Sequence, residues 1–281
     1  MDRLKLNIVT TDWLAKNIDA PDVRVVDASW YLPTEGRSGR AEFKAAHIPG
    51  AAFFDIDEIA DTISPLPHML PSPEKFSSRV RRLGLGDGLR IIVYDGKGIY
   101  SAPRVWWMFK AFGHDQIAVL DGGLPKWRAE GRMIDNLPPF PRERHFTARL
   151  NEDLVRTKDQ VLEAIKSGSE QIVDARSAGR FAGTDPEPWD GVRSGHMPGA
   201  INVPFDTLTH PNGTFRGPME NKSAFAAAGI DFDKPIITTC GSGVTAALLA
   251  LALTDAGHKQ VAVYDGSWAE WGADDSLPVE K

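Results

Sequence analysis

The sequence predicts a chain of two α/β domains, each with a central, mostly parallel sheet flanked by helices. Short apolar runs typical of buried strands alternate with helical patterns along the whole chain. The same order of motifs occurs twice in the 281 residues, and a proline-rich, charged segment separates the two copies. We therefore place one domain at residues 1–136, a linker at 137–156 and a second domain at 157–281.

The first copy begins with capping residues before an amphipathic pattern, which predict a helix over 10–18. A strand over 23–28 follows, and then a His-Ile-Pro-Gly-Ala turn at 47–51. A further strand runs into a glycine-rich loop over 90–98. The rest of the copy is predicted to hold a helix at 105–113, a strand at 117–120 and the motif Asp121–Trp127.

The second copy repeats this order. His196–Ala200 corresponds to His47–Ala51, and Ile236–Gly243 corresponds to Ile91–Gly98. The offset between matching residues stays between 144 and 149. Because this period is far longer than the units of solenoid proteins, it indicates a duplicated domain.

The only cysteine of the chain, Cys240, lies between a strand predicted to end at Thr239 and an apolar helix that begins near Thr245. Gly241 and Gly243 allow successive N–H groups to converge on one point, and the helix adds its positive dipole end. In such a setting we expect the thiol pKa to fall from ~8.5 to ~5–7. A lone cysteine is more often a small buried apolar residue, but this context favours a nucleophile.

Asp95 occupies the position of Cys240 in the first copy. A carboxylate is no soft nucleophile, so we expect the first domain to be catalytically silent. It then serves to shape the substrate site, with the active cleft between the two domains.

Composition excludes several classes of function. The net charge is −6 and no long basic run occurs, which argues against a nucleic-acid partner. No cluster of cysteine and histidine has the spacing of zinc ligands. Residues 1–7 lack an apolar leader pattern, and no apolar stretch is long enough to enter a membrane. A single cysteine fits the reducing cytoplasm.

The loop Cys240–Thr245 and the two His-(Ile/Met)-Pro-Gly-Ala turns make the chain resemble the two-domain rhodanese superfamily, and within it the 3-mercaptopyruvate sulfurtransferases. The similarity spans nearly the whole chain and includes the strings at 29–33, 49–57, 68–71, 100–108 and 264–268. It implies tandem rhodanese-like domains that move sulfur from 3-mercaptopyruvate to Cys240. Pyruvate leaves, and the enzyme persulfide passes its sulfur to a thiol acceptor, such as a thioredoxin-type protein, or to cyanide. Because the persulfide carries the sulfur, the resemblance calls for no metal and no organic cofactor.

The resemblance also implies a proton relay of Ser242, His68 and Asp57. Without it, His68 would be read as a turn histidine and Asp57 as an ordinary acid at a helix start. The loop residues that follow the cysteine are expected to hold the donor and the persulfide through their backbone amides: Gly241, Ser242, Gly243, Val244 and Thr245.

The donor carboxylate calls for an arginine, and Arg180 matches an arginine of the family. A second family arginine usually follows Pro-Glu-Pro, but here Trp189 follows it. Three consequences are open: Arg180 binds the carboxylate alone, Arg193 or Arg104 substitutes for the missing arginine, or the donor differs from mercaptopyruvate.

His47 and His196 recur in both copies, including the one without a cysteine, so a structural role in the turn is expected for them. Five tryptophans are expected to pack in the core or at a domain interface: Trp106, Trp107, Trp127, Trp268 and Trp271.

Three other functions compete with the main hypothesis. Thiosulfate sulfurtransferases share the fold, but a dianionic donor favours cationic side chains where this loop has Gly241 and Ser242. A cysteine phosphatase would need an arginine at the position of Ala246 to clamp a phosphoryl group. A silent binding module fits Asp95 in the first domain but not the intact cysteine loop of the second.

Overall fold

The computed structural model describes residue 4 and residues 6–281 of the chain. The expectation that residues 1–7 form no leader segment lies partly outside these described residues. The chain divides into two compact units. The first consists of Met1–Asp61, Leu70–Asn151 and Thr209–Phe215, and the second of Thr62–Met69, Glu152–Leu208 and Arg216–Lys281. A simple division at 137–156 stays a prediction.

The first unit contains a five-stranded parallel sheet in the order β1-β5-β4-β2-β3. Its strands are β1 (Ile8–Val9), β2 (Val23–Asp27), β3 (Ala52–Phe53), β4 (Arg90–Tyr94) and β5 (Ile117–Leu120). Its helices are α1 (Thr11–Asn17), α2 (Gly39–Ala45), α3 (Pro73–Arg82), α4 (Ala102–Ala111) and α5 (Gly123–Ala129), with a 3-10 turn at Pro33–Glu35.

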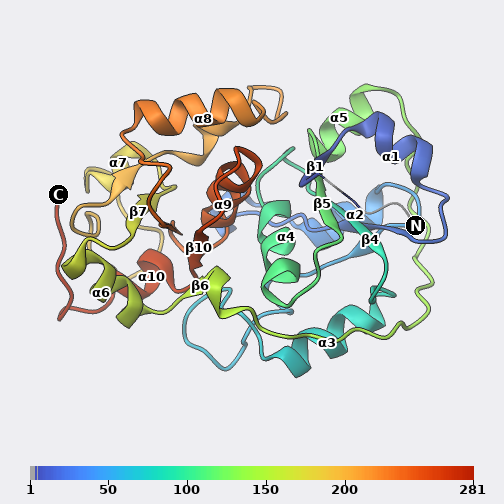
Figure 1. The fold of residues 1–281 in the computed structure, drawn as a ribbon. Helices are drawn as coiled ribbons and strands as arrows, with labels where there is room; N and C mark the ends of the chain where they lie inside the picture. Colours follow the sequence, from blue (N-terminus) through green and yellow to red (C-terminus); the bar gives the residue numbers. More distant parts are fainter. Residues whose placement is uncertain (1–3, 5) are drawn as a thin grey trace. The chain divides into compact units, whose positions relative to one another are not determined.

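Both faces of this sheet are covered, which is why its central strands are almost continuously apolar. Figure 1 shows α1 and α5 on one side of the sheet and α3 and α4 on the other. Leu14 of α1 and Trp127 of α5 pack with Val25 and Ile92 of the strands. On the other side, Phe76 of α3 packs against several aromatic rings of the unit.

The second unit repeats the architecture with the strand order β6-β10-β9-β7-β8, again all parallel. Its strands are β6 (Val155–Arg156), β7 (Gln171–Asp174), β8 (Ile201–Asn202), β9 (Ile236–Thr239) and β10 (Val261–Tyr264). Its helices are α6 (Lys158–Ser167), α7 (Ala178–Phe181), α8 (Pro218–Ala227), α9 (Ala246–Asp255) and α10 (Ser267–Trp271), with 3-10 turns at Glu152–Leu154 and Phe205–Leu208.

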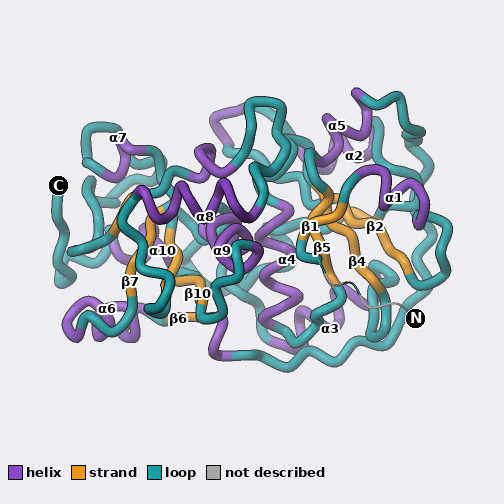
Figure 2. The backbone as a smooth tube through the Cα atoms, turned by 45° about the horizontal axis from the view of Figure 1, so that its top comes forward, coloured by secondary structure: helices purple, strands orange, loops and turns teal. Residues whose placement is uncertain are grey.

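The two sheets correspond strand for strand in their order. Figure 2 shows the strands of each unit in orange. The predicted α/β class and its duplication are confirmed. In each unit the strand that precedes the glycine-rich loop, β4 or β9, has a neighbour on both sides. The loop therefore starts at the carboxyl end of an inner strand, where α/β proteins place their sites.

Part of the predicted linker packs on the first unit. Phe146 is 3% exposed and its ring contacts those of Phe76 and Phe109. Ser77 donates its hydroxyl hydrogen to the carbonyl of Phe146 at 2.7 Å. This aromatic contact fixes the middle of a segment whose composition alone indicates a flexible connection.

Candidate active site

Cys240 is the first residue after β9, and α9 begins six residues later. Its side chain is buried, with 2% of the residue exposed. The backbone N–H of Gly243, a residue with φ of 80°, donates to Cys240 Sγ at 3.1 Å. The predicted strand–loop–helix arrangement is present, with the thiol at the amino-terminal end of a buried helix.

A second turn holds the backbone of this loop. Ser267 Oγ accepts the N–H of Cys240 at 3.2 Å and donates to the carbonyl of Tyr264 at 2.8 Å. The N–H groups of Trp268 and Ala269 donate to the carbonyls of Cys240 and Gly241 at 3.0 and 2.8 Å. Ser267 adopts a φ of 50°, a region that is sparsely populated without glycine. The sequence reasoning missed Ser267, although it lies in one of the strings that carry the resemblance.

The corresponding loop of the first unit directs several backbone N–H groups at the side chain of one residue, Asp95. Asp95 Oδ2 accepts the N–H groups of Tyr100, Ser101 and Ala102 at 2.8–2.9 Å, at the start of α4. Its Oδ1 accepts the N–H of Lys97 at 2.9 Å. Asp95 holds the sequence position that corresponds to Cys240, but its donors lie two and five to seven residues further on, whereas the donor to Cys240 Sγ lies three residues further on.

His68 and Ser242 are brought together in the second unit. His68 Nδ1 and Ser242 Oγ lie 3.0 Å apart, within hydrogen-bonding distance. His68 has a φ of 61°, so its backbone also adopts the left-handed region. Such conformations cost about 1 kcal/mol or more and persist only where the surroundings require them.

Asp57 belongs to the first unit, where its carboxylate accepts the indole N–H of Trp30 at 3.1 and 3.2 Å. Arg104 belongs to α4 of the same unit. It is fully buried, and its guanidinium lies 4.5 Å from the ring centre of Trp107.

Arg180 lies in α7, and its guanidinium pairs with the carboxylate of Glu187. That carboxylate also accepts from Arg176 Nη1 at 2.8 Å, and its side chain is 1% exposed. Asp174 completes the network, since Arg176 donates to it from Nη2 at 2.7 Å. Burial lowers the pKa of Arg176, but the two carboxylates more than offset this effect and leave its pKa raised.

Arg180 and Trp189 both reach the cysteine loop at Gly241. A Cβ at Gly241 would lie 2.9 Å from Arg180 Nη2 and 3.0 Å from the nearest ring atom of Trp189. The absence of a side chain at this position therefore makes room for both groups. The sequence reasoning identified Trp189 as a departure from the family pattern, but not its contact with the loop.

Arg193, one of the two substitutes considered for the missing arginine, has its guanidinium directed at backbone carbonyls. It donates to the carbonyls of Gly272, Leu277 and Trp271 at 3.1–3.2 Å, and also to that of Asp274. These bonds tie the segment after α10 to the turn before β8. The donors of Arg193 are thus already used in holding the fold.

The repeated histidines have equivalent contacts in both units. His47 Nδ1 lies 2.7 Å from the backbone carbonyl oxygen of Phe43, and the imidazole ring stacks on the phenyl ring of the same residue. His196 Nδ1 lies 2.9 Å from the backbone carbonyl oxygen of Phe181, and its imidazole ring stacks on the Phe181 ring. These contacts fit the structural role predicted for both. The five tryptophans expected to pack in the interior are all buried.

Within residue 4 and residues 6–281, no group of three His, Cys, Asp or Glu side chains is placed to hold a metal ion. No helix in this part of the chain is both long and apolar enough to cross a membrane.

Comparisons with known proteins agree with this geometry. The family model of the rhodanese-like domain matches residues 10–130 and 157–274. Human 3-mercaptopyruvate sulfurtransferase is 44% identical over 270 residues, which cover 94% of this chain and 91% of the human protein. Rat thiosulfate sulfurtransferase is 45% identical over 271 residues, with the same two coverages.

Among solved structures, the crystal structure of SseA from Escherichia coli, reported for the rhodanese fold and catalytic mechanism of 3-mercaptopyruvate sulfotransferases, is 41% identical. It superposes with a TM-score of 0.87 over 94% of this chain and 99% of that chain. With two domain matches, relatives above 40% identity and a cysteine loop built like an anion site, the chain belongs to the rhodanese family.

Proposed function

We propose that this protein is a sulfurtransferase that takes sulfur from 3-mercaptopyruvate and carries it as a persulfide on Cys240. The placement of the thiol carries the proposal: Cys240 Sγ accepts the backbone N–H of Gly243 in the loop that leads from β9 into the buried helix α9. Relatives named as 3-mercaptopyruvate and thiosulfate sulfurtransferases support the same chemistry. A sulfur anion is stabilised by such a site both before and after it accepts a second sulfur atom.

The first half-reaction is a displacement at sulfur. The Cys240 thiolate attacks the donor sulfur, an S–S bond forms, and the bond between that sulfur and C3 of the donor breaks. The electron pair of the broken bond remains on the organic fragment as the enolate of pyruvate. One proton on C3 then completes pyruvate, and the enzyme keeps the transferred sulfur as a persulfide.

Ser242 and His68 are the groups we propose for that proton. Their 3.0 Å contact allows the imidazole to orient the hydroxyl or exchange a proton with it. Ser242 lies two residues from the sulfur that bonds to the donor. We assign to Asp57 the third position of the relay, where its carboxylate would orient the imidazole.

We propose that Arg180 binds the donor carboxylate. Its guanidinium reaches Gly241, next to the nucleophile, and Glu187 fixes its orientation. Arg180 Nε has no acceptor among the described residues, so the guanidinium keeps donor capacity that Glu187 does not use. Trp189 then provides an apolar wall on the same side of the loop. Gly241, Gly243, Val244 and Thr245 contribute backbone amides.

In the second half-reaction an acceptor attacks the outer sulfur of the persulfide and regenerates the Cys240 thiolate. A thiol acceptor of the thioredoxin type suits this step, because its second thiol releases the sulfur by forming a disulfide. Cyanide serves as an artificial acceptor, and thiocyanate leaves. A single, buried, reduced cysteine fits work in a reducing compartment such as the cytoplasm.

The test compares pyruvate release from 3-mercaptopyruvate with thiocyanate formation from thiosulfate, for the wild type and for Cys240→Ser. We expect mercaptopyruvate, with its single carboxylate, to be the better donor, since residues 240–245 add no cationic side chain to Arg180 for the second charge of thiosulfate. We also expect the variant to lose both activities. Intact-mass measurement after one equivalent of donor, without acceptor, should show the gain of one sulfur atom in the wild type alone.

A preference for thiosulfate would overturn the donor assignment but leave the carrier role intact. Sulfur transfer that survives in Cys240→Ser would overturn the carrier role itself.

A further inference from the structure

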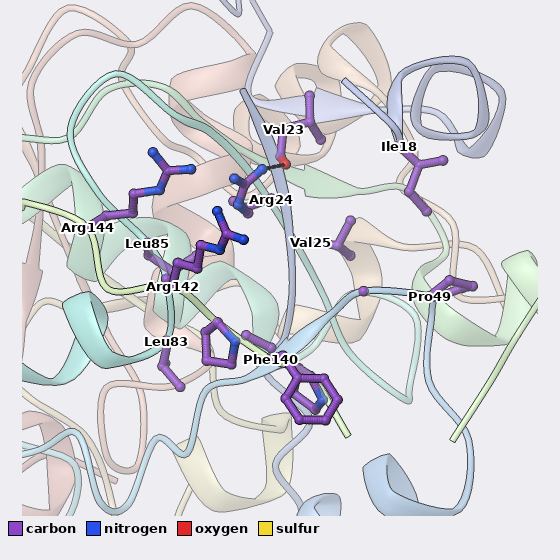
Figure 3. A pocket seen from close by; sticks show the side chains of 15 residues that line it. Ile18, Val23, Arg24, Val25, Pro49, Leu83, Leu85, Phe140, Arg142 and Arg144 are labelled. Carbon is purple, nitrogen blue, oxygen red and sulfur yellow. Dashed lines mark hydrogen bonds between the residues drawn. The ribbon is translucent and has the colours of Figure 1, made fainter. Parts of the chain in front are cut away.

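A pocket of about 490 Å³ opens in the first unit, and its lining includes no residue of the cysteine loop (Figure 3). Its lining comes from the end of α1, from β2 and β3, from the turn after α3, and from residues 139–144. The volume lies within the ~300–1,000 Å³ of pockets that bind small organic molecules.

The segment that closes this pocket is docked closely on the turn after α3. A Cβ at Gly86 would lie 2.5 Å from Cβ of Arg144 and from the carbonyl oxygen of His145. Only a residue without a side chain allows this approach. The N–H of Asp87 donates to the carbonyl of His145 at 2.8 Å. The backbone that bears Arg142 and Arg144 is therefore held in place.

Arg24, Arg142 and Arg144 all line the pocket, and Figure 3 shows their guanidinium groups directed to the same side of it. None of the three pairs with a carboxylate in the described part of the chain. Arg24 Nη1 donates instead to the carbonyls of Val23 and Pro21, at 2.6 and 3.1 Å.

Burial, followed by repulsion from Arg144, lowers the pKa of Arg24. Asp22 opposes this effect, but its carboxylate is engaged by Nε and Nη2 of Arg90 at 2.8 and 2.9 Å. Like charges held together without a counter-charge are unfavourable, and a bound anion relieves them.

The remaining wall is apolar. Ile18, Val25 and Leu85 line it, and Figure 3 places Phe140 at the edge away from the guanidinium groups. Phe140 is 91% exposed, although its neighbours are fixed by the docked segment. Its exposed ring offers a flat apolar face to a ligand in the pocket.

We propose that this pocket binds a nucleoside monophosphate, with the phosphate held by Arg142, Arg144 and Arg24 and the base lying against Phe140. Guanidinium groups match the oxygens of a phosphate in pairs, and the flat ring matches a base. Inorganic phosphate shares the first half of this chemistry, and an uncharged nucleoside shares the second. The inference does not depend on the sulfurtransferase activity.

Calorimetric titration of the full-length protein at low ionic strength with AMP, adenosine and inorganic phosphate tests the proposal. We expect AMP to bind more tightly than either part alone. Arg142→Ala and Arg144→Ala should each weaken AMP binding about tenfold, the loss expected for a charge-assisted hydrogen bond. Phe140→Ala should weaken AMP binding and leave phosphate binding unchanged.

Arg149→Ala is the matched control, because Arg149 is an exposed arginine of the same segment that lies outside the pocket. It should bind AMP like the wild type. The proposal is overturned if AMP binds no more tightly than phosphate, if the Arg142 and Arg144 variants bind AMP normally, or if Arg149→Ala weakens binding as much as they do.

Discussion

Gly241→Ala tests whether Arg180 and Trp189 meet the cysteine loop as described. The new Cβ would lie 2.9 Å from Arg180 Nη2 and 3.0 and 3.1 Å from two ring atoms of Trp189. Non-bonded atoms of this kind prefer ~3.5–4.0 Å, so both side chains must retreat by roughly 0.5–1 Å. Gly241 does not have a positive φ, so alanine fits its backbone and strain of the main chain plays no part.

Forcing one extra methyl group into a packed site costs ~1–3 kcal/mol. Since the groups that move are those proposed to bind the donor carboxylate, we expect this cost in transition-state binding. A loss of ~2 kcal/mol corresponds to a fall of about 30-fold in kcat/KM for 3-mercaptopyruvate.

The assay is steady-state pyruvate release by the wild type, Gly241→Ala, Trp189→Ala and the double variant. Trp189→Ala removes the ring that the new methyl group meets, so the double variant should be more active than Gly241→Ala. The coupling between the two substitutions should reach at least ~0.5 kcal/mol, as for residues in contact. Wild-type activity in Gly241→Ala, or a loss that Trp189→Ala does not relieve, would refute this reasoning.

Three further predictions concern the surroundings of the site and the stability of the fold. Glu187→Gln removes the buried counter-charge of Arg180, so the unfolding free energy measured by urea denaturation should fall by about 3 kcal/mol. The KM for mercaptopyruvate should rise as well. An unchanged KM would show that Glu187 does not contribute to donor binding. Ser267→Ala leaves the buried N–H of Cys240 without its acceptor, so the unfolding free energy should fall by ~1–3 kcal/mol. We expect kcat to fall as well. A wild-type kcat in this variant would show that the hydrogen bond does not position the nucleophile. Burial lowers the pKa of His114, so below pH ~6.5 the unfolded chain takes up a proton that the folded chain does not, and stability falls as the pH falls. In His114→Gln the loss of unfolding free energy between pH 7 and pH 5 should be smaller, and an equal loss would assign it to other groups.

The sequence was sufficient to predict the elements whose signals are local. Apolar runs located the strand Ile117–Leu120, and a glycine-rich loop between a strand and an apolar helix located Cys240. The two-fold repeat then predicted the common order of both sheets. Each strand or loop signal lies within about ten residues of chain, so it can be read locally. The repeat provides a second occurrence of the same order.

The contacts that hold the site have no such signal. Ser267 caps the N–H of Cys240 from 27 residues away, in a backbone conformation that serine rarely adopts. Glu187 and Arg176 pair across a sequence separation of 11, which contains only the short helix α7 and irregular loops. A charged residue in such a stretch is expected to be solvated, and only folding reveals that it is buried with a partner.

The predicted linker shows a related difficulty. Phe146 is one of several apolar residues that are spaced without a regular period among charges and prolines, so it gives no helix or strand signal. In the structure it belongs to an aromatic cluster with Phe76 and Phe109. The packing of Phe146 holds the backbone near Arg142 and Arg144. A segment predicted from its composition to be a linker therefore forms one wall of a pocket.

The two copies of the glycine-rich loop explain each other. In the first unit the carboxylate of Asp95 accepts four backbone N–H groups, so the anion site is filled by a side chain that cannot react as a soft nucleophile. In the second unit Cys240 Sγ accepts one N–H among the described residues, that of Gly243. A thiol that fills less of the same kind of site leaves backbone amides for a further atom. In the proposed reaction, addition of a second sulfur would extend the anion toward these backbone donors, and the four N–H groups around Asp95 show how many donors a loop of this kind can direct at one side chain.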